Sequence, residues 1–181
     1  MKKLITTTLI IIFLVSTGMS QVFDGINLKE DTELLKSKLK DKGFVFNYGL
    51  GSSLKFTGDY DDKSTTVYSV STIKSNKTIV LSAFVGDAQS WDELLSTYRK
   101  YVKMFSDKYG NPDVYFESFK PPYDKNFIGK ELQAVKEDKA NFLSEWTRDG
   151  ITYAVEIFQY KSVIIRYKSE ENYELNKMEL K

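Results

Sequence analysis

Residues that could carry out chemistry are few in this chain, and the missing types exclude most catalytic systems. The 181 residues include no cysteine and no histidine. A serine or cysteine nucleophile activated by histidine is therefore excluded, as are a zinc finger and a disulfide. Carboxylates remain as candidate acids, bases and metal ligands.

The densest acidic cluster is formed by Asp59, Asp61 and Asp62. Oxygen ligands at this spacing suit Ca²⁺, which is a hard cation. The EF-hand pattern does not continue, however, because Lys63 follows and no glutamate closes the loop at the required distance. The sequence therefore predicts a solvated hairpin turn here, and we expect no metal and no cofactor.

Three glutamates, Glu117, Glu145 and Glu156, fall in segments that alternate like strands. Glycoside hydrolysis needs two carboxyl groups about 5–9.5 Å apart. We expect each of the three on the polar face of a half-buried sheet, where its role is solvation. A hydrolase that uses carboxylates alone and acts on glycans remains an alternative.

Two further patterns match catalytic or phosphate-binding motifs only in part. Ser-x-x-Lys occurs at residues 37–40 and 71–74, but the Ser-Asp-Asn and Lys-Thr-Gly motifs of penicillin-recognising enzymes are both missing. The pair Gly49-x-Gly51 lacks the third glycine and the following helix of a phosphate loop. We predict no catalytic residue.

The two tryptophans are the first aromatic candidates, since such rings stack on sugars or anchor a partner protein. Trp91 falls in the first turn of an expected helix, and Trp146 shares a strand face with Phe142. Both positions favour packing in the core.

The remaining aromatic candidates are Tyr123 and Phe127, in a polar segment (120–137) that contains Pro121-Pro122. Loops held by a rigid scaffold often carry function. We therefore predict that these two rings contact a partner. The alternative is that they pin the loop to the sheet.

Residues 1–20 have the pattern of a secretory signal peptide. Two lysines precede an unbroken apolar run at 9–15, and small residues precede a cut between Ser20 and Gln21. The run is shorter than the roughly 20 apolar residues of a membrane span. We predict a secreted or periplasmic protein that is soluble after cleavage and has no membrane anchor.

Charge gives no sign of a nucleic-acid partner. After cleavage the chain has 24 basic and 25 acidic residues, which are interspersed. A basic patch or stripe is the electrostatic footprint of nucleic-acid binding, and a polybasic cluster that of anionic lipid. We expect neither partner.

The hydrophobic pattern predicts helices at 31–42 and from Ser90 to Tyr109, where Glu93 completes a capping box with Ser90. We also expect a short helix at 130–135, and a polar tail from Glu170 onward. Period-two alternation predicts strands. The strands are expected near 44–48, 54–58, 67–73, 79–85, 113–119, 140–148, 150–159 and 161–168.

This order predicts an α+β fold made of tandem helix-plus-four-stranded antiparallel sheet units (α-β4-α-β4), with the helices packed on one sheet face. The first unit is 21–88 and the second 89–169, with an inserted loop at 120–137 and a polar tail at 170–181. The two units are expected to form one compact domain.

An internal duplication would explain this order. Val67 matches Ile151, and Ile79 matches Val163, in both cases 84 positions apart. The alternative is coincidence between two amphipathic stretches.

Four short motifs resemble small secreted proteins of uncharacterised function from Bacteroidetes bacteria. They are Phe-Asp-Gly-Ile at 23–26, Leu-x-x-Lys-Gly-Phe at 39–44, Ser-Trp-x-x-Leu at 90–94 and Lys-Tyr-Gly-x-Pro at 108–112. The resemblance covers most of the mature chain and brings no catalytic residues. The repeat layout is also similar to β-lactamase-inhibitor-protein-like folds, which implies binding rather than catalysis.

We therefore expect a non-enzymatic binding module. Its partner is expected to be a protein, peptide or glycan in the cell envelope, contacted through an exposed sheet face or the 120–137 loop. Besides the carboxylate hydrolase, a self-associating structural component of the envelope is the other alternative.

Overall fold

The computed structural model describes Phe23, residues 25–123 and residues 128–181, so the predicted signal peptide lies outside the described residues. Within the described part, no helix combines the length and the apolar character needed to cross a membrane. The helices are α1 (Thr32–Asp41), α2 (Trp91–Tyr109), α3 (Glu131–Lys136) and α4 (Glu170–Glu179). The strands are β1 (Val45–Leu50), β2 (Ser53–Tyr60), β3 (Lys63–Ser71), β4 (Thr78–Val85), β5 (Val114–Phe119), β6 (Ala140–Arg148), β7 (Ile151–Phe158) and β8 (Ser162–Ser169).

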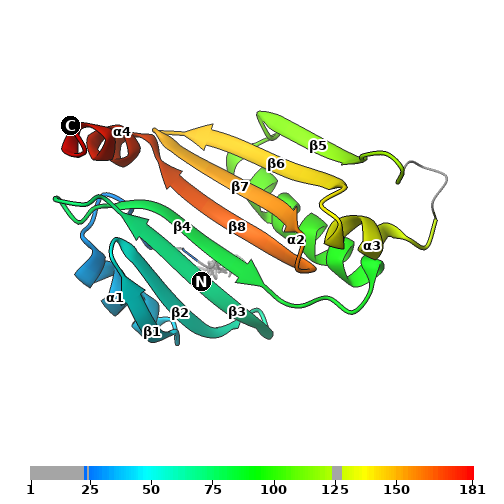
Figure 1. The fold of residues 1–181 in the computed structure, drawn as a ribbon, viewed down its shortest axis with the longest axis horizontal. Helices are drawn as coiled ribbons and strands as arrows, with labels where there is room; N and C mark the ends of the chain where they lie inside the picture. Colours follow the sequence, from blue (N-terminus) through cyan, green and yellow to red (C-terminus); the bar gives the residue numbers. More distant parts are fainter. Residues whose placement is uncertain (1–22, 24, 124–127) are drawn as a thin grey trace, which may run out of the picture.

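All eight strands form one antiparallel sheet in the order β1-β2-β3-β4-β8-β7-β6-β5 (Figure 1). Each half of the sheet is a meander of neighbouring hairpins, and the halves join where β4 pairs with β8. Two-residue turns with positive φ connect β2 to β3 at Asp61-Asp62 and β6 to β7 at Asp149-Gly150. This backbone conformation matches the right-handed twist of a hairpin, which is why Asp and Gly serve there.

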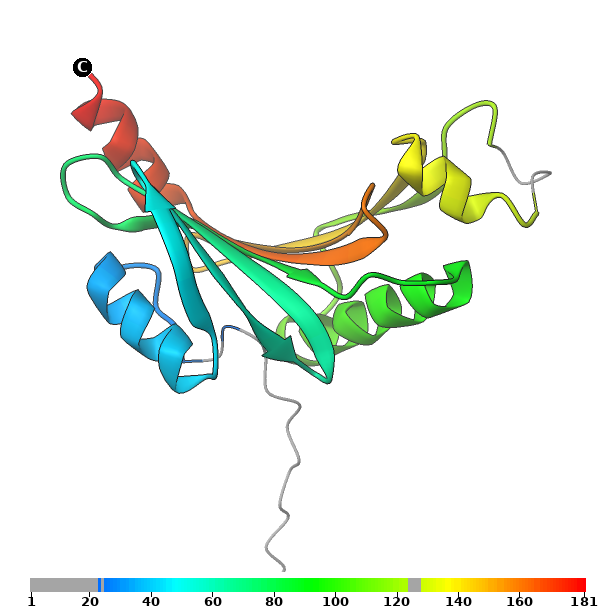
Figure 2. The same cartoon turned by 60° about the horizontal axis from the view of Figure 1, so that its bottom comes forward.

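The expected α+β class and antiparallel sheet are confirmed, and the helices pack on the sheet. Helices α1 and α2 lie on one face, whereas α3 and α4 stand at the two ends of the other (Figure 2). The expectation that all helices share one face therefore holds only for α1 and α2. Helix α3 interrupts the second half between β5 and β6, inside the expected insertion.

The core lies between the sheet and the helices α1 and α2. Trp146 is completely buried, stacks on Phe105 of α2 with ring centroids 5.4 Å apart, and donates its Nε1–H to the Gly110 carbonyl at 2.9 Å. Trp91 is partly buried against Phe119 and Phe142. Both tryptophans are core residues, as the sequence predicts.

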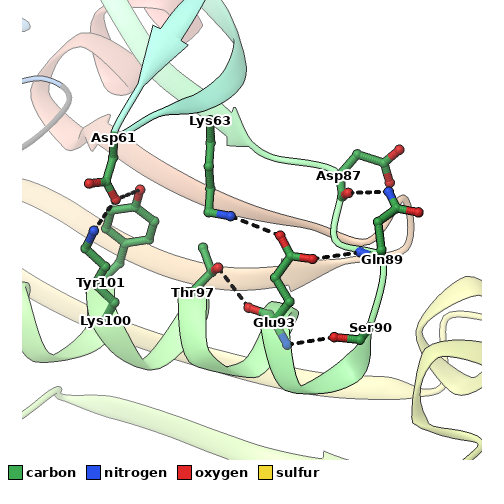
Figure 3. Close-up of polar contacts among 9 residues, drawn as sticks. All are labelled: Asp61, Lys63, Asp87, Gln89, Ser90, Glu93, Thr97, Lys100 and Tyr101. Atoms are coloured by element: carbon green, nitrogen blue, oxygen red, sulfur yellow. Dashed lines mark hydrogen bonds and ion pairs between the residues drawn. The ribbon is translucent and has the colours of Figure 1, made fainter.

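Local signals explain where the two long helices begin. Asp31 caps α1 by accepting from the Leu34 N–H at 2.9 Å, and Ser90 caps α2 by accepting from the Glu93 N–H at 3.1 Å. The predicted capping box is modified, because the Glu93 carboxylate accepts from the Gln89 N–H at 2.9 Å (Figure 3). Side chains thereby satisfy backbone donors that the first turn leaves free.

The polar tail is helix α4, and one buried side chain fastens it to the rest of the fold. The amide nitrogen of Asn172 donates to the carbonyls of Leu28 and Thr78, both at 2.8 Å. Asn172 is 4% exposed. It therefore links the last helix to the segment before α1 and to the start of β4.

Candidate functional site

The strand register identifies the face of the sheet that α1 and α2 leave uncovered, which we call the open face. Phe56, Leu81 and Ile165 point toward these two helices and are buried. Their strand neighbours point the other way, because side chains alternate along a strand. No helix in the described part of the chain crosses the middle of the open face, and α3 and α4 rise at its two ends (Figure 2).

Four aromatic rings form a continuous line across the open face, which we call the aromatic row: Tyr68, Phe84, Phe158 and Tyr160. Successive ring centroids lie 5.6, 5.5 and 5.3 Å apart, all in edge-to-face geometry. Tyr68 is 36% exposed and Tyr160 is 70% exposed, so the row displays apolar surface to solvent. Ile164 also faces this side but is only 2% exposed, since the rings cover it.

The aromatic row lines an open hollow of about 780 Å³ at the α3 end of the face. That volume lies within the range of about 300–1,000 Å³ found for ligand pockets. Its rim carries charged groups from three elements: Asp87 after β4, Lys136 of α3 and Lys161 of the β7–β8 turn. Lys161 pairs with Asp87 at 3.0 Å, and Lys136 adds a second cation to the rim from α3.

A second hollow of about 220 Å³ adjoins the first and shares Phe158 and Gln159 with it. Its lining is polar, with Glu145, Glu156 and Arg166 among the residues. Arg166 donates to the Glu156 carboxylate at 3.0 Å. The two hollows together offer an apolar wall beside groups that donate and accept hydrogen bonds.

This geometry brings together only two of the three glutamates considered as hydrolytic candidates. Glu145 and Glu156 are diagonal neighbours, because Glu145 pairs with Ala154 and Glu156 with Leu143. Glu117 lies on the opposite face, where Arg99 of α2 is 3.5 Å from its carboxylate. The expectation of solvated, polar-face positions thus holds for Glu145 and Glu156, which are half-buried on the open face.

The acidic cluster at Asp59–Asp62 serves the structure of the β2–β3 hairpin. The Asp61 carboxylate accepts hydrogen bonds from the Lys100 ammonium and, at 3.2 Å, from the Tyr101 hydroxyl (Figure 3). Both donors lie on α2. The hairpin is thereby fastened to the helix. Among the described residues, no three or more carboxylates gather in a way that would hold a metal ion.

A second ion pair ties the same hairpin to the start of α2. Lys63 donates to Glu93 at 3.1 Å (Figure 3). The hydrogen bond from the Gln89 backbone, followed by the one from Lys63, lowers the pKa of Glu93. These contacts fix the helix rather than create a reactive group.

The structure buries Tyr123, one of the two rings that the sequence predicts to contact a partner. Tyr123 is 6% exposed, its N–H donates to the Lys120 carbonyl at 3.0 Å, and its hydroxyl bonds to Glu137 just after α3. Burial, and then the bond to Glu137, raise the pKa of the Tyr123 hydroxyl. This burial fits the alternative that the Tyr123 ring pins the loop, and the contact of Tyr123 with a partner stays a prediction. Phe127 lies outside the described residues, so its partner contact remains a prediction.

The sequence reasoning missed the aromatic row, although each ring lies in an expected strand or turn. Tyr68, Phe84 and Phe158 come from β3, β4 and β7, and they meet only because β4 pairs with β8. The available signal was Phe158-x-Tyr160, two aromatic residues beside a hairpin turn. Comparisons with protein-family models, with curated proteins and with solved structures find no match to this chain.

Proposed function

We propose that the mature chain is a secreted, non-catalytic binding module whose open face holds the ligand. The observation that carries this proposal is the aromatic row beside the 780 Å³ hollow. Contiguous apolar surface that is exposed on a soluble domain, and that polar groups surround, is typical of interaction sites. Buried aromatic contacts also supply a large share of binding energy in many interfaces.

Among protein, peptide and glycan, the geometry favours a glycan. A sugar ring has an apolar face and a rim of hydroxyl groups. The first hollow offers aromatic edges and faces, and the second offers the carboxylate, amide and guanidinium groups of Glu145, Gln159 and Arg166 within the same surface. A ligand that lies across both hollows would use each kind of group at once.

Binding is tested with the isotope-labelled mature protein and a panel of soluble peptidoglycan fragments, neutral oligosaccharides and short peptides. Chemical-shift changes that concentrate on the aromatic row support the proposal when they come from a glycan. Changes at the same residues from peptides alone would overturn the choice of ligand, and changes elsewhere would overturn the choice of face.

The matched variants are Tyr160→Ala in the row and Tyr115→Ala on β5, which is 54% exposed and points to the other side of the sheet. Both rings are exposed, so we expect each change to alter stability by about 0.5 kcal/mol or less. Loss of a ring at the centre of a contact costs about 2 kcal/mol, or roughly 30-fold in affinity. We expect this loss for Tyr160→Ala and not for Tyr115→Ala.

A glycan hydrolase is the second candidate, because Glu145 and Glu156 share one hollow beside the proposed ligand. Turnover of a glycan that binds, and its loss in Glu145→Gln, would establish this activity. Binding without turnover by the unchanged protein would exclude it for that glycan.

We also propose that residues 1–20 are cleaved, which would place the module in the periplasm or outside the cell. The tandem α-β4 layout is part of the same proposal. The central pair of the β4–β8 seam, Ser82 with Arg166, supports it. These two residues are 84 positions apart, which is the offset that relates Ile79 to Val163 in the sequence.

A further inference from the structure

Strand β1 forms one edge of the sheet, beside α1 (Figure 1), and it is exposed along its whole length. Val45 is 64% exposed, Phe46 47%, Tyr48 52% and Leu50 78%. A sheet edge offers a row of unpaired backbone groups to any other strand. Proteins usually protect such edges with charged side chains or proline, and β1 has neither.

The opposite edge, β5, differs in this respect. It carries Glu117, which pairs with Arg99 of α2 at 3.5 Å. An added strand there would lie against this ion pair. The two edges are therefore not equivalent, and β1 is the one suited to strand addition.

An irregularity in β1 decides which side chains share a face. The register shifts between Phe46 and Tyr48, so Val45, Tyr48 and Leu50 all lie on the open face. Phe46 lies on the helix face, where it contacts Phe56 at 5.5 Å between ring centroids. Gly49 lies on the helix face as well, since it pairs with Leu54.

This arrangement makes β1 complementary to itself. In an antiparallel pair of β1 strands centred between residues 47 and 48, Val45 lies opposite Leu50 of the second copy, on the same face. Phe46 lies opposite Gly49 of the second copy, on the helix face, where Leu54 and Phe46 of the same chain border the space over that glycine. The apolar pairs of Val45 with Leu50, one on each side of the axis, are the cross-strand contacts that stabilise the pairing.

The charges at this edge are compatible with a second copy. Because β1 has no charged residue, two copies pair without like charges facing each other. The ammonium groups of Lys36 and Lys55 lie over the rings of Phe46 and Tyr48, so they disfavour an added strand that carries lysine or arginine. We propose that two copies of this protein associate through β1, about a two-fold axis, into one continuous sheet that leaves both open faces free.

The test is sedimentation equilibrium of the mature protein over roughly 1–300 μM, a range that suits a small and therefore weak interface. We expect the mass to rise from one chain to two and no further, because a two-fold contact closes on itself. Masses beyond two chains, or one chain throughout, would overturn the proposal.

The variants test the register itself. The double change Val45→Lys with Leu50→Lys places like charges across the axis, and we expect one chain at every concentration. The double change Val45→Glu with Leu50→Lys places opposite charges there, and we expect the dimer to return. Phe116→Lys, on the β5 edge, is the control and should leave the dimer intact.

All three positions are at least 48% exposed, so unchanged melting temperatures are expected and show that the variants fold. Failure of the Glu/Lys variant to restore association would refute the proposed register. Loss of association in Phe116→Lys would assign the contact to β5 and overturn the β1 interface.

Discussion

Ser69 and Ser71 are a matched pair of buried serines, and we expect their replacement by alanine to change the free energy of unfolding in opposite directions. Both lie on β3 and face the helices, and they are 0% and 4% exposed. The Ser69 hydroxyl has no hydrogen-bond partner among the described residues, whereas the Ser71 hydroxyl donates to the Ser52 carbonyl at 3.1 Å. The two serines thus differ mainly in whether the buried polar group is satisfied.

An unsatisfied buried hydroxyl costs about 1–3 kcal/mol, and a change from serine to alanine, which replaces the hydroxyl by hydrogen, removes that cost. Ala leaves a void of only one oxygen atom, so we expect Ser69→Ala to raise the free energy of unfolding by about 1 kcal/mol. In a domain of this size that is roughly 2–4 °C in Tm. Ser71→Ala loses a made hydrogen bond, and we expect it to lower the free energy of unfolding by about 1 kcal/mol.

The assay is urea unfolding of both variants beside the unchanged protein, with calorimetry as a second measure. Because strand propensity, side-chain size and the direction faced are shared, the difference between the variants isolates the hydrogen bond. A Ser69→Ala variant that is less stable than the unchanged protein would refute the reasoning.

Two further tests address the attachment of α4 and the start of α2. Asn172→Ala leaves two buried carbonyls without a donor, and we expect urea unfolding to show a free energy of unfolding lower by about 2–4 kcal/mol. A decrease no larger than that of an ordinary surface change would mean that α4 does not depend on this contact. For Glu93, whose pKa the Gln89 and Lys63 contacts lower, the contribution to stability is present above its ordinary pKa and fades as pH falls through the lowered value. Below about pH 5, the Tm of Glu93→Gln should therefore fall less steeply with decreasing pH than the Tm of the unchanged protein. Equal slopes for the two proteins would contradict this assignment.

The elements of this fold follow largely from local signals. Asp31 and Ser90 begin helices, and Gly43, with φ of 89°, follows the end of α1. Turns such as Asp149-Gly150 predict their hairpins, because their residue types favour the required backbone angles. These features depend on residues close together in the chain.

Contacts between distant segments could not be predicted in the same way. Pairing of β4 with β8 is one choice among several that the alternating patterns allow, and the aromatic row depends on it. The hydroxyl of the buried Tyr123 bonds to Glu137, the residue after α3, and no spacing in the sequence indicates that contact. The sequence therefore left the contact surface open between an exposed sheet face and the 120–137 loop, and it could not indicate which rings meet on the sheet.

The seam between β4 and β8 also determines how this chain can fold. The hairpins close loops of two to six residues, and the pairing of β5 with β6 closes the segment 120–139 that contains α3. Each half therefore forms from contacts that are much nearer in sequence than the seam. The pairing of β4 with β8 instead closes a loop of about eighty residues. The conformational entropy lost on closing this loop opposes the pairing until the contacts between the strands have formed. We infer that the two half-sheets form early and that their joining limits the folding rate. Until that step, β4 and β8 are themselves free edges, and the period between synthesis and joining is when this chain is most exposed to aggregation.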